Sequence, residues 1–167
     1  SLHDALPILF SLGALFATRA SINKMNGAQE LHTRAVEAER AHYQWAEGLC
    51  SAIGLGTEFE GTLDYKSCEL GKYLYSAAAK KDKEVAPLIE KIIPVHQRIH
   101  ENAATIDFSA GGQKAHQIYL EKIRPDIDEL IGLLNEVIAV SDKQVERSKH
   151  FTQTLLVVSV IILLVLE

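Results

Sequence analysis

The feature that most constrains this chain is a helical spacing of apolar residues, which recurs in three long segments. The first segment, up to about residue 53, carries Leu31, Ala35, Ala38, His42, Trp45, Leu49 and Ala52 at three- and four-residue intervals. Similar stripes run through residues 84–108 and from Gln113 onward, and a shorter helix is expected at 67–79. Each stripe would face a shared core. The chain is therefore predicted to be all-α, an antiparallel four-helix bundle in up-down-up-down order.

Glycine and proline mark the expected connections. Gly54, Gly56 and Gly61 should end the first helix, and residues 54–66 should form an irregular connection. A turn is expected at 109–112, and Pro125 predicts a bend in the last helix.

Both ends of the chain are strongly apolar. Residues 6–17 and 155–166 are each about a dozen residues long, shorter than the roughly 20 of a membrane helix. We interpret them as two truncated transmembrane helices that continue the first and last helices of the bundle. The predicted organisation is a membrane segment at 1–18, a sensor domain at 19–151 and a membrane segment at 152–167. Residues 1–8 resemble translated sequencing adapter and are expected to be non-native.

Two alternatives for these ends stay open. Either run could be a buried end of a core helix, and the first could belong to a signal peptide. With two membrane segments, both ends of the bundle would emerge on the same side of the membrane. The flanking charges at Arg19, Lys24, Arg147 and Lys149 do not decide which side.

Composition excludes several classes of function. The net charge of −5, without a Lys/Arg cluster, argues against a nucleic-acid partner. The two cysteines form no CxxC or CxxCH motif, so neither a disulfide framework nor a c-type haem is supported. We find no nucleophile–base pair, phosphate loop or HExxH sequence, and therefore do not expect an enzyme.

Four side chains of metal-ligand type stand out in these helices. They are His42, Cys68, His96 and His100. The two histidines four residues apart lie on one face of a helix, one turn from each other. Three imidazoles and one thiolate suit a tetrahedral zinc ion. His42 and His96 also occupy apolar stripe positions, where a buried imidazole without a partner costs about 1–3 kcal/mol.

Helix geometry predicts that these side chains can meet. His42 and His96 each lie about twelve residues before the expected membrane-distal ends of their helices, so they fall at the same level of the bundle. The connection before Cys68 is long enough to descend to that level. A thiol at a helix N-terminus should have a lowered pKa, which would favour the thiolate that metals bind.

Other residues carry weaker expectations. His116 lies on the stripe of the last helix and is interpreted as a core histidine or a supporting group rather than a fifth ligand. Cys50 is expected to be a buried small residue, although a disulfide with Cys68 would exclude zinc. Gly71 is expected to let the second helix approach the third. A di-iron carboxylate site is a minor alternative. Such a site needs two Glu-x-x-His elements, and only residues 39–42 have that spacing.

The pattern resembles a known family. A lone histidine precedes, by 25 residues, residues 68–73 (CELGKY), and 22 residues later comes 96–100 (HQRIH). This is similar to the chemoreceptor zinc-binding (CZB) domain, over about residues 32–104. The resemblance implies that His42, Cys68, His96 and His100 are zinc ligands. Residues 59–64 (FEGTLD) resemble variants from extracytoplasmic sensor regions of methyl-accepting chemotaxis proteins.

The expected function follows from the resemblance and from the apolar ends. It is a zinc-binding sensory domain of a bacterial transmembrane chemoreceptor that signals zinc or redox state through helix packing. It would lie in the inner membrane with the sensor outside the cytoplasm, as a homodimer by analogy with receptors. The alternative is a structural zinc site in a sensor module of a histidine kinase or cyclic-dinucleotide enzyme that detects another ligand.

Overall fold

The chain is helical throughout the part that the structure describes. The computed structural model describes residues 2–108 and 112–166, with side chains for 9–108 and 112–165. Its elements are α1 (Leu2–Leu55), α2 (Glu69–Leu74), α3 (Ala86–Ala104), α4 (Gly112–Ile118), the π-helix η1 (Tyr119–Ile123) and α5 (Arg124–Leu166). No strand occurs among these described residues, which confirms the all-α class. Most of the expected turn at 109–112 lies outside them.

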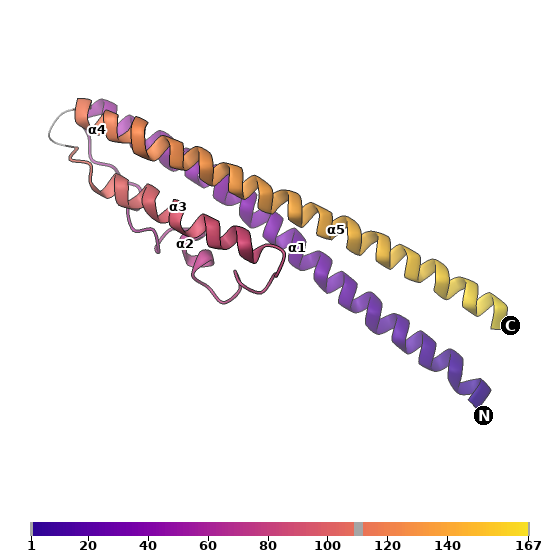
Figure 1. Cartoon of the computed structure of the whole chain (residues 1–167). Coiled ribbons are helices and arrows are strands. Elements are labelled where there is room, and N and C mark those ends of the chain that lie inside the picture. The colour runs from indigo at the N-terminus through magenta and orange to yellow at the C-terminus, as the bar shows by residue number, and fades with distance from the viewer. Residues whose placement is uncertain (1, 109–111, 167) are drawn as a thin grey trace. The chain divides into compact units, whose positions relative to one another are not determined.

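The chain divides into two compact units, and the first to consider is Thr33–Ile138. Within this unit the chain ascends α1, returns through an irregular connection and α2, ascends α3, and descends through α4, η1 and α5 (Figure 1). The up-down-up-down order therefore holds, but the second leg is mostly irregular chain, as expected for residues 54–66. The expected helix at 67–79 is only six residues long.

The end of α1 shows why the chain turns back where it does. Gly56 has a φ of 65°, in the left-handed region that favours glycine. The N–H of Thr57 donates to the carbonyl of Ala52 at 3.1 Å, which satisfies one of the free carbonyls of the last turn. The helix thus ends at Leu55, as the glycines predict.

Local capping fixes the short helix α2. Cys68 is its N-cap, and its Sγ accepts a hydrogen bond from the N–H of Gly71 at 3.2 Å. The helix ends at Leu74. Gly71 packs tightly against the connection that precedes it: a Cβ there would overlap the carbonyl oxygen of Tyr65. This contact holds α2 against the backbone that leads into it.

A π-helix before Pro125 changes the register of the last leg. Arg124 N–H bonds to the Tyr119 carbonyl, five residues back. Pro125 has no N–H and its ring crowds the preceding turn, so a wider turn relieves both problems. The apolar stripe expected through His116 is wrong here: this side chain is exposed, as is Leu120, whereas Ala115 and Ile123 are buried.

The core of this unit follows the predicted stripes elsewhere. Its largest fully buried apolar side chains are Leu49, Leu74, Val85, Ile92, Ile99, Ile123, Leu130 and Val137. They come from α1, α2, α3, η1 and α5 and from the turn before α3. Burial of one such side chain contributes roughly 1.5–3 kcal/mol. Every leg of the chain is thus held by apolar contact.

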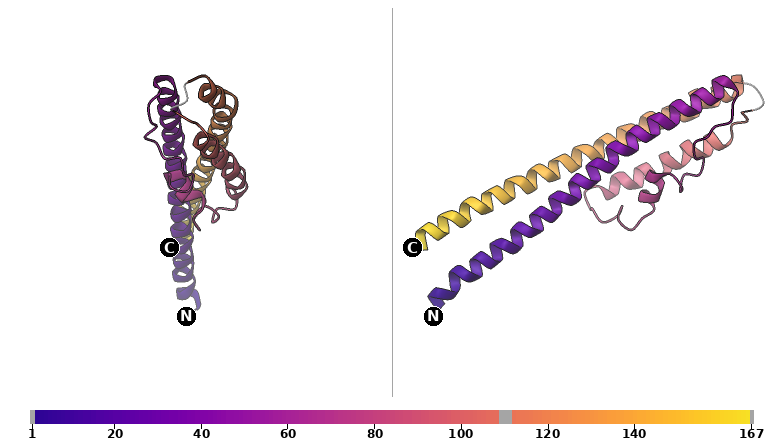
Figure 2. Two further views of the ribbon diagram at one scale, coloured as in Figure 1. Left: turned by 90° about the vertical axis from the view of Figure 1, so that its left-hand side faces the viewer. Right: turned by 180° about the vertical axis from the view of Figure 1, so that it is seen from behind.

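The second unit contains residues 1–32 and 139–167, and its two helical segments run side by side (Figure 2). Ser21 Oγ donates to the Ser148 carbonyl at 3.0 Å and accepts from Thr152 Oγ1 at 3.0 Å. His32 Nδ1 lies 2.8 Å from Asp142 Oδ1. Polar contacts therefore link the two segments.

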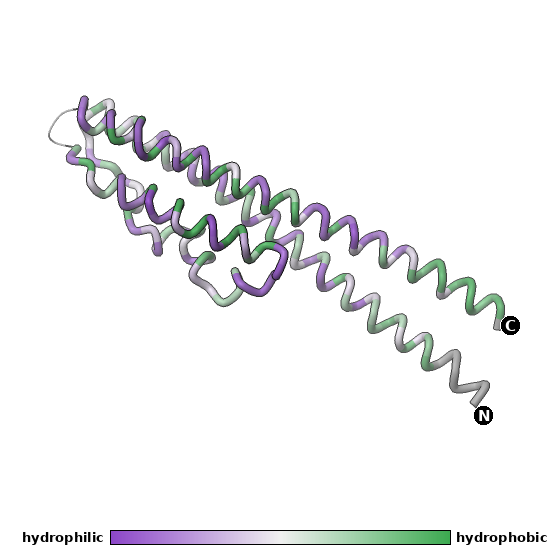
Figure 3. The backbone as a smooth tube through the Cα atoms, viewed as in Figure 1, coloured by the Kyte–Doolittle hydropathy of each residue, from purple (hydrophilic) through white to green (hydrophobic). Residues whose placement is uncertain are grey.

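The C-terminal turns of α5 are apolar and exposed (Figure 3). Among the described residues, one helical stretch, Gly112–Val165, is long and apolar enough to cross a membrane. Within this stretch, the apolar window itself is only 6% buried, so that window does not pack into the core of the described residues. The expected first membrane segment falls partly on residues 1–8, whose side chains lie outside the described part.

Candidate metal centre

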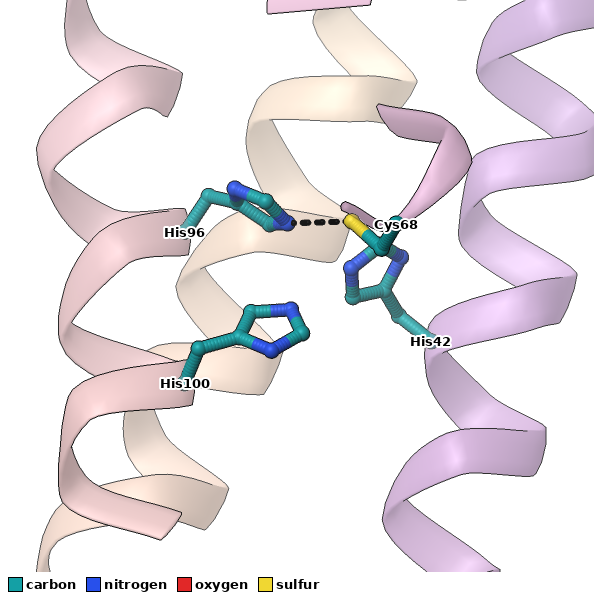
Figure 4. A group of neighbouring side chains, drawn as sticks. All are labelled: His42, Cys68, His96 and His100. Carbon is teal, nitrogen blue, oxygen red and sulfur yellow. Dashed lines mark hydrogen bonds between the residues drawn. The ribbon is translucent and has the colours of Figure 1, made fainter. Parts of the chain in front are cut away.

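Four side chains converge inside the unit Thr33–Ile138. His42 comes from α1, Cys68 caps α2, and His96 and His100 come from adjacent turns of α3 (Figure 4). One nitrogen of each histidine and the sulfur all lie within 4.8 Å of one another. The structure therefore brings together all four residues that the sequence analysis singled out.

The distances within this cluster are close to those around a metal ion. Cys68 Sγ lies 3.1 Å from His96 Nε2. The ring of His42 lies 5.1 Å from that of His96 and 6.1 Å from that of His100, and the two α3 rings are 4.7 Å apart, centre to centre. Around a tetrahedral zinc ion the ligand atoms are roughly 3.3–3.7 Å apart, given bonds of about 2.0–2.3 Å.

The hydrogen bonding of the imidazoles leaves nitrogens available to a metal. His42 Nδ1 donates to the Ala38 carbonyl at 2.8 Å, which leaves Nε2 free to bind. His96 Nδ1 and both nitrogens of His100 are buried without a hydrogen-bond partner. Buried polar atoms of this kind cost about 1–3 kcal/mol each. A metal ion would employ one nitrogen of each ring, so the residues present fit a zinc ion.

Burial keeps the three histidines neutral. The pKa of His96 falls from 6.5 to about 3, first because of burial and then because of His42 and His100 beside it. The pKa of His100 falls to about 4, again chiefly through burial. Burial also lowers the pKa of His42. Neutral imidazole is the form that binds metals.

The metal-free protein is expected to lose stability in acid. Because the folded pKa values of His96 and His100 lie below 6.5, the unfolded chain takes up protons between about pH 6.5 and 4 while the folded chain does not. Each histidine then removes about 1.4 kcal/mol per pH unit in that window. Urea unfolding in chelator at pH 7, 5.5 and 4.5 measures this. His96→Ala should reduce the slope; an unchanged slope contradicts the assignment.

The cysteine differs from the sequence expectation. Burial raises the pKa of the Cys68 thiol, and the N–H groups of Gly71 and Leu70 lower it by less. The N-terminal effect of α2 is therefore present but is outweighed, because the side chain is more than half removed from solvent. A nearby cation would supply the charge that stabilises the thiolate.

An aromatic layer covers one side of the cluster. The Trp45 ring lies 5.0 Å from that of His100, and Phe59 packs edge-on against Trp45 at 5.4 Å. Trp45 Nε1 donates to the Thr62 carbonyl at 2.9 Å, which ties the 56–68 connection to α1. Sequence reasoning treated Trp45 only as a core residue and missed this contact. The sequence offered one indication of this contact: the indole N–H of a tryptophan on an apolar stripe usually needs a hydrogen-bond partner.

Replacing Trp45 with phenylalanine should remove this tie but keep an aromatic ring. We expect a loss of about 1 kcal/mol in the free energy of unfolding, the usual contribution of one hydrogen bond. Trp45 is the only tryptophan, so the variant loses the fluorescence signal of unfolding. Circular dichroism in urea is therefore used to measure the difference in stability. Tyr43→Phe, on the exposed side of α1, is the control and should have no effect. Equal stability of all three proteins would show that the Thr62 contact is unimportant.

The remaining histidines and the other cysteine lie outside the cluster. His116 is exposed on α4, so its interpretation as a core histidine is wrong: the apolar stripe passes through Ala115 instead. His32 contacts Asp142, and His150 is exposed. Cys50 is half-buried and has a free thiol, like Cys68.

Comparison with known proteins identifies one matching family. Residues 42–106, under half of the chain, match the family model of the chemoreceptor zinc-binding domain. No curated protein and no solved structure matches the chain. The matched segment contains all four residues of the cluster. Residues 42–106 are thus similar to a zinc-binding domain, and within them the chain carries a His/Cys/His/His cluster suited to that metal.

Proposed function

We propose that His42, Cys68, His96 and His100 bind one zinc ion in the sensory domain of a bacterial transmembrane chemoreceptor. The observation that carries this proposal is their convergence in a buried site where three imidazole nitrogens have no hydrogen-bond partner. The match of residues 42–106 to a chemoreceptor zinc-binding domain supports it.

Four protein ligands favour sensing over catalysis. They would fill the coordination shell of zinc and leave no position for a substrate water. The ligands come from three helices, α1, α2 and α3. Gain or loss of the ion would therefore alter how these helices pack, and we propose this change as the signal.

A redox input is the second part of the proposal. Of the four cluster residues, Cys68 alone is not fully buried, and its thiol is the oxidisable group among them. A peroxide or hypohalous acid that oxidised the thiolate to a sulfenic acid would replace a strong zinc ligand by a weak one. Cys68 would then link the oxidation state of the surroundings to zinc occupancy.

The membrane context is proposed from composition. Residues 1–18 and 152–167 would be membrane segments flanking a sensor domain at 19–151, in a homodimeric receptor. The exposed apolar end of α5 supports the second segment. The extracytoplasmic side stays a prediction from the FEGTLD resemblance. Labelling of Glu58→Cys by a membrane-impermeant maleimide in intact cells tests it: reaction indicates the outer side, and protection indicates the cytoplasm.

Metal analysis with chelator titration tests the central claim. The purified chain should contain about one zinc ion, and the ion should exchange over the range of zinc concentrations that cells experience. The alternative is a structural zinc site in a sensor of a histidine kinase or cyclic-dinucleotide enzyme. In that case helical content and thermal stability would collapse together on zinc removal, without a graded response. A zinc-free protein under zinc-replete conditions would exclude both.

A further inference from the structure

Arg98 links the helix that carries two of the cluster histidines to α5. Its Nε donates to Asp126 Oδ2 at 3.2 Å, and one terminal nitrogen donates to Asp126 Oδ1 at 2.7 Å. The same nitrogen reaches Glu129 Oε2 at 3.3 Å. Arg98 thus holds two carboxylates of α5 with its planar guanidinium, the geometry that gives an arginine pair its directional strength.

The position of Arg98 on α3 gives this contact its significance. It lies two residues after His96 and two before His100, so it projects from the other side of the helix. One side of α3 therefore holds the metal cluster, and the other holds α5. A rotation or shift of α3 that brings the two imidazoles onto an ion must move the guanidinium as well.

The receiving end of this contact is the irregular start of the last leg. Asp126 follows Pro125 and the π-helix η1, where the regular four-residue hydrogen bonding is interrupted. α3 also packs against η1. The Asp126 side chain is 15% exposed and that of Arg98 is 47% exposed, so the ion pair is shielded from solvent on its carboxylate side. This first turn of α5 takes its position from α3 as well as from its own backbone.

We propose that Arg98 couples the metal site on α3 to α5, so that zinc binding tightens the first turns of α5 through Asp126 and Glu129. The inference rests on the proposed zinc binding and adds the route out of the site. Arg98 is a positioning residue, since it lies on α3 without contacting the metal. Lysine would keep its charge but lose the two-pronged contact.

Hydrogen exchange of the whole chain in detergent micelles tests the coupling. Amide protection of residues 124–138 is measured by mass spectrometry with zinc and with chelator, and zinc content is measured first in every protein. The variants are Arg98→Ala, Arg98→Lys and Asp126→Asn. Lys91→Ala, another exposed cation of α3, is the matched control.

Zinc should increase protection of α5 in the wild type and in Lys91→Ala. In Arg98→Ala that increase should fall about fivefold, the effect of losing one favourable ion pair, while zinc content stays near one. The zinc-dependent increase in Arg98→Lys should be intermediate between those of the wild type and Arg98→Ala. Adding Asp126→Asn to Arg98→Ala should reduce this increase little further. A merely stabilising pair would lower protection equally with and without zinc.

Two results would overturn the proposal, and they are distinguishable. If Arg98→Ala keeps the full zinc-dependent increase in α5, or the wild type binds zinc without such an increase, the coupling is wrong while zinc binding stands. If the wild type holds no zinc, the proposed function fails together with it.

Discussion

Replacement of His96 by alanine is expected to abolish stoichiometric zinc binding. His96 is fully buried and its Nε2 lies 3.1 Å from Cys68 Sγ, so the substitution removes a donor atom from the interior of the cluster. Zinc in a complete four-ligand site is bound by about 10–16 kcal/mol in small zinc domains, and a three-ligand site retains only part of that energy. Metal analysis after purification should show a fall from about one ion per chain to less than roughly a tenth.

Stability measurements separate metal binding from ordinary packing. In zinc, the wild type should be much more resistant to urea than His96→Ala, because the ion binds only the folded state. In chelator the difference in stability between the wild type and His96→Ala should become small. The variant leaves a cavity, but it also removes a buried Nδ1 that has no partner, and the two effects oppose each other.

A histidine outside the cluster provides the control. His116→Ala removes an exposed imidazole from α4 and should leave zinc content and stability unchanged. In the same way, Cys50→Ala is the control for Cys68→Ala. Full zinc content in His96→Ala, or equal loss in His116→Ala, would show that the ion binds elsewhere.

The sequence predicts the level of the histidines because helices have a fixed rise. The position of a residue in the apolar stripe gives the side of the helix on which its side chain lies, and its distance from the helix end gives its height along the axis. His42 and His96 were expected at one height, and their rings lie 5.1 Å apart. The 96–100 pair follows from the same geometry. Residue types then suggest zinc, since imidazole and thiolate are its preferred ligands.

The features that the sequence does not predict depend on the path of irregular chain. The connection 56–68 is irregular, and helix α2 extends only from Glu69 to Leu74, shorter than the expected 67–79. The Trp45–Thr62 hydrogen bond and the Gly71–Tyr65 contact depend on that path. The prediction for His116 was wrong because the π-turn before Pro125 adds one residue to the helical repeat. The apolar stripe on the N-terminal side of that turn is therefore rotated around the helix relative to the stripe in α5. Periodicity carries no information about such an insertion.

Gly71→Ala is expected to be the most damaging substitution outside the four cluster residues. A Cβ at Gly71 would overlap the Tyr65 carbonyl oxygen and lie 2.9 Å from its carbonyl carbon. Both neighbours are backbone, so no side-chain rotation can relieve the clash. Such overpacking costs about 1–3 kcal/mol or more, and we expect the upper end of that range. Urea unfolding in chelator measures this part of the effect without the metal.

The same substitution should also weaken zinc binding, because Gly71 and Cys68 are linked. The N–H of Gly71 donates to Cys68 Sγ at 3.2 Å, and the Tyr65–Lys66 backbone leads directly into that cysteine. Moving either segment to admit a methyl group displaces the sulfur from the three imidazoles. Since ligand atoms must lie within a few tenths of an ångström of their ideal distances, zinc affinity should fall by at least tenfold in a competition titration.

A second glycine provides the control for this experiment. Gly132 lies inside α5, and a Cβ there would meet nothing within 4 Å. Gly132→Ala should therefore stabilise the protein by up to about 1 kcal/mol through helix propensity, with zinc affinity unchanged. If Gly71→Ala behaved like Gly132→Ala, the tight contact with Tyr65 would be wrong. The route by which Cys68 reaches the histidines would then have to differ from the one seen in this structure.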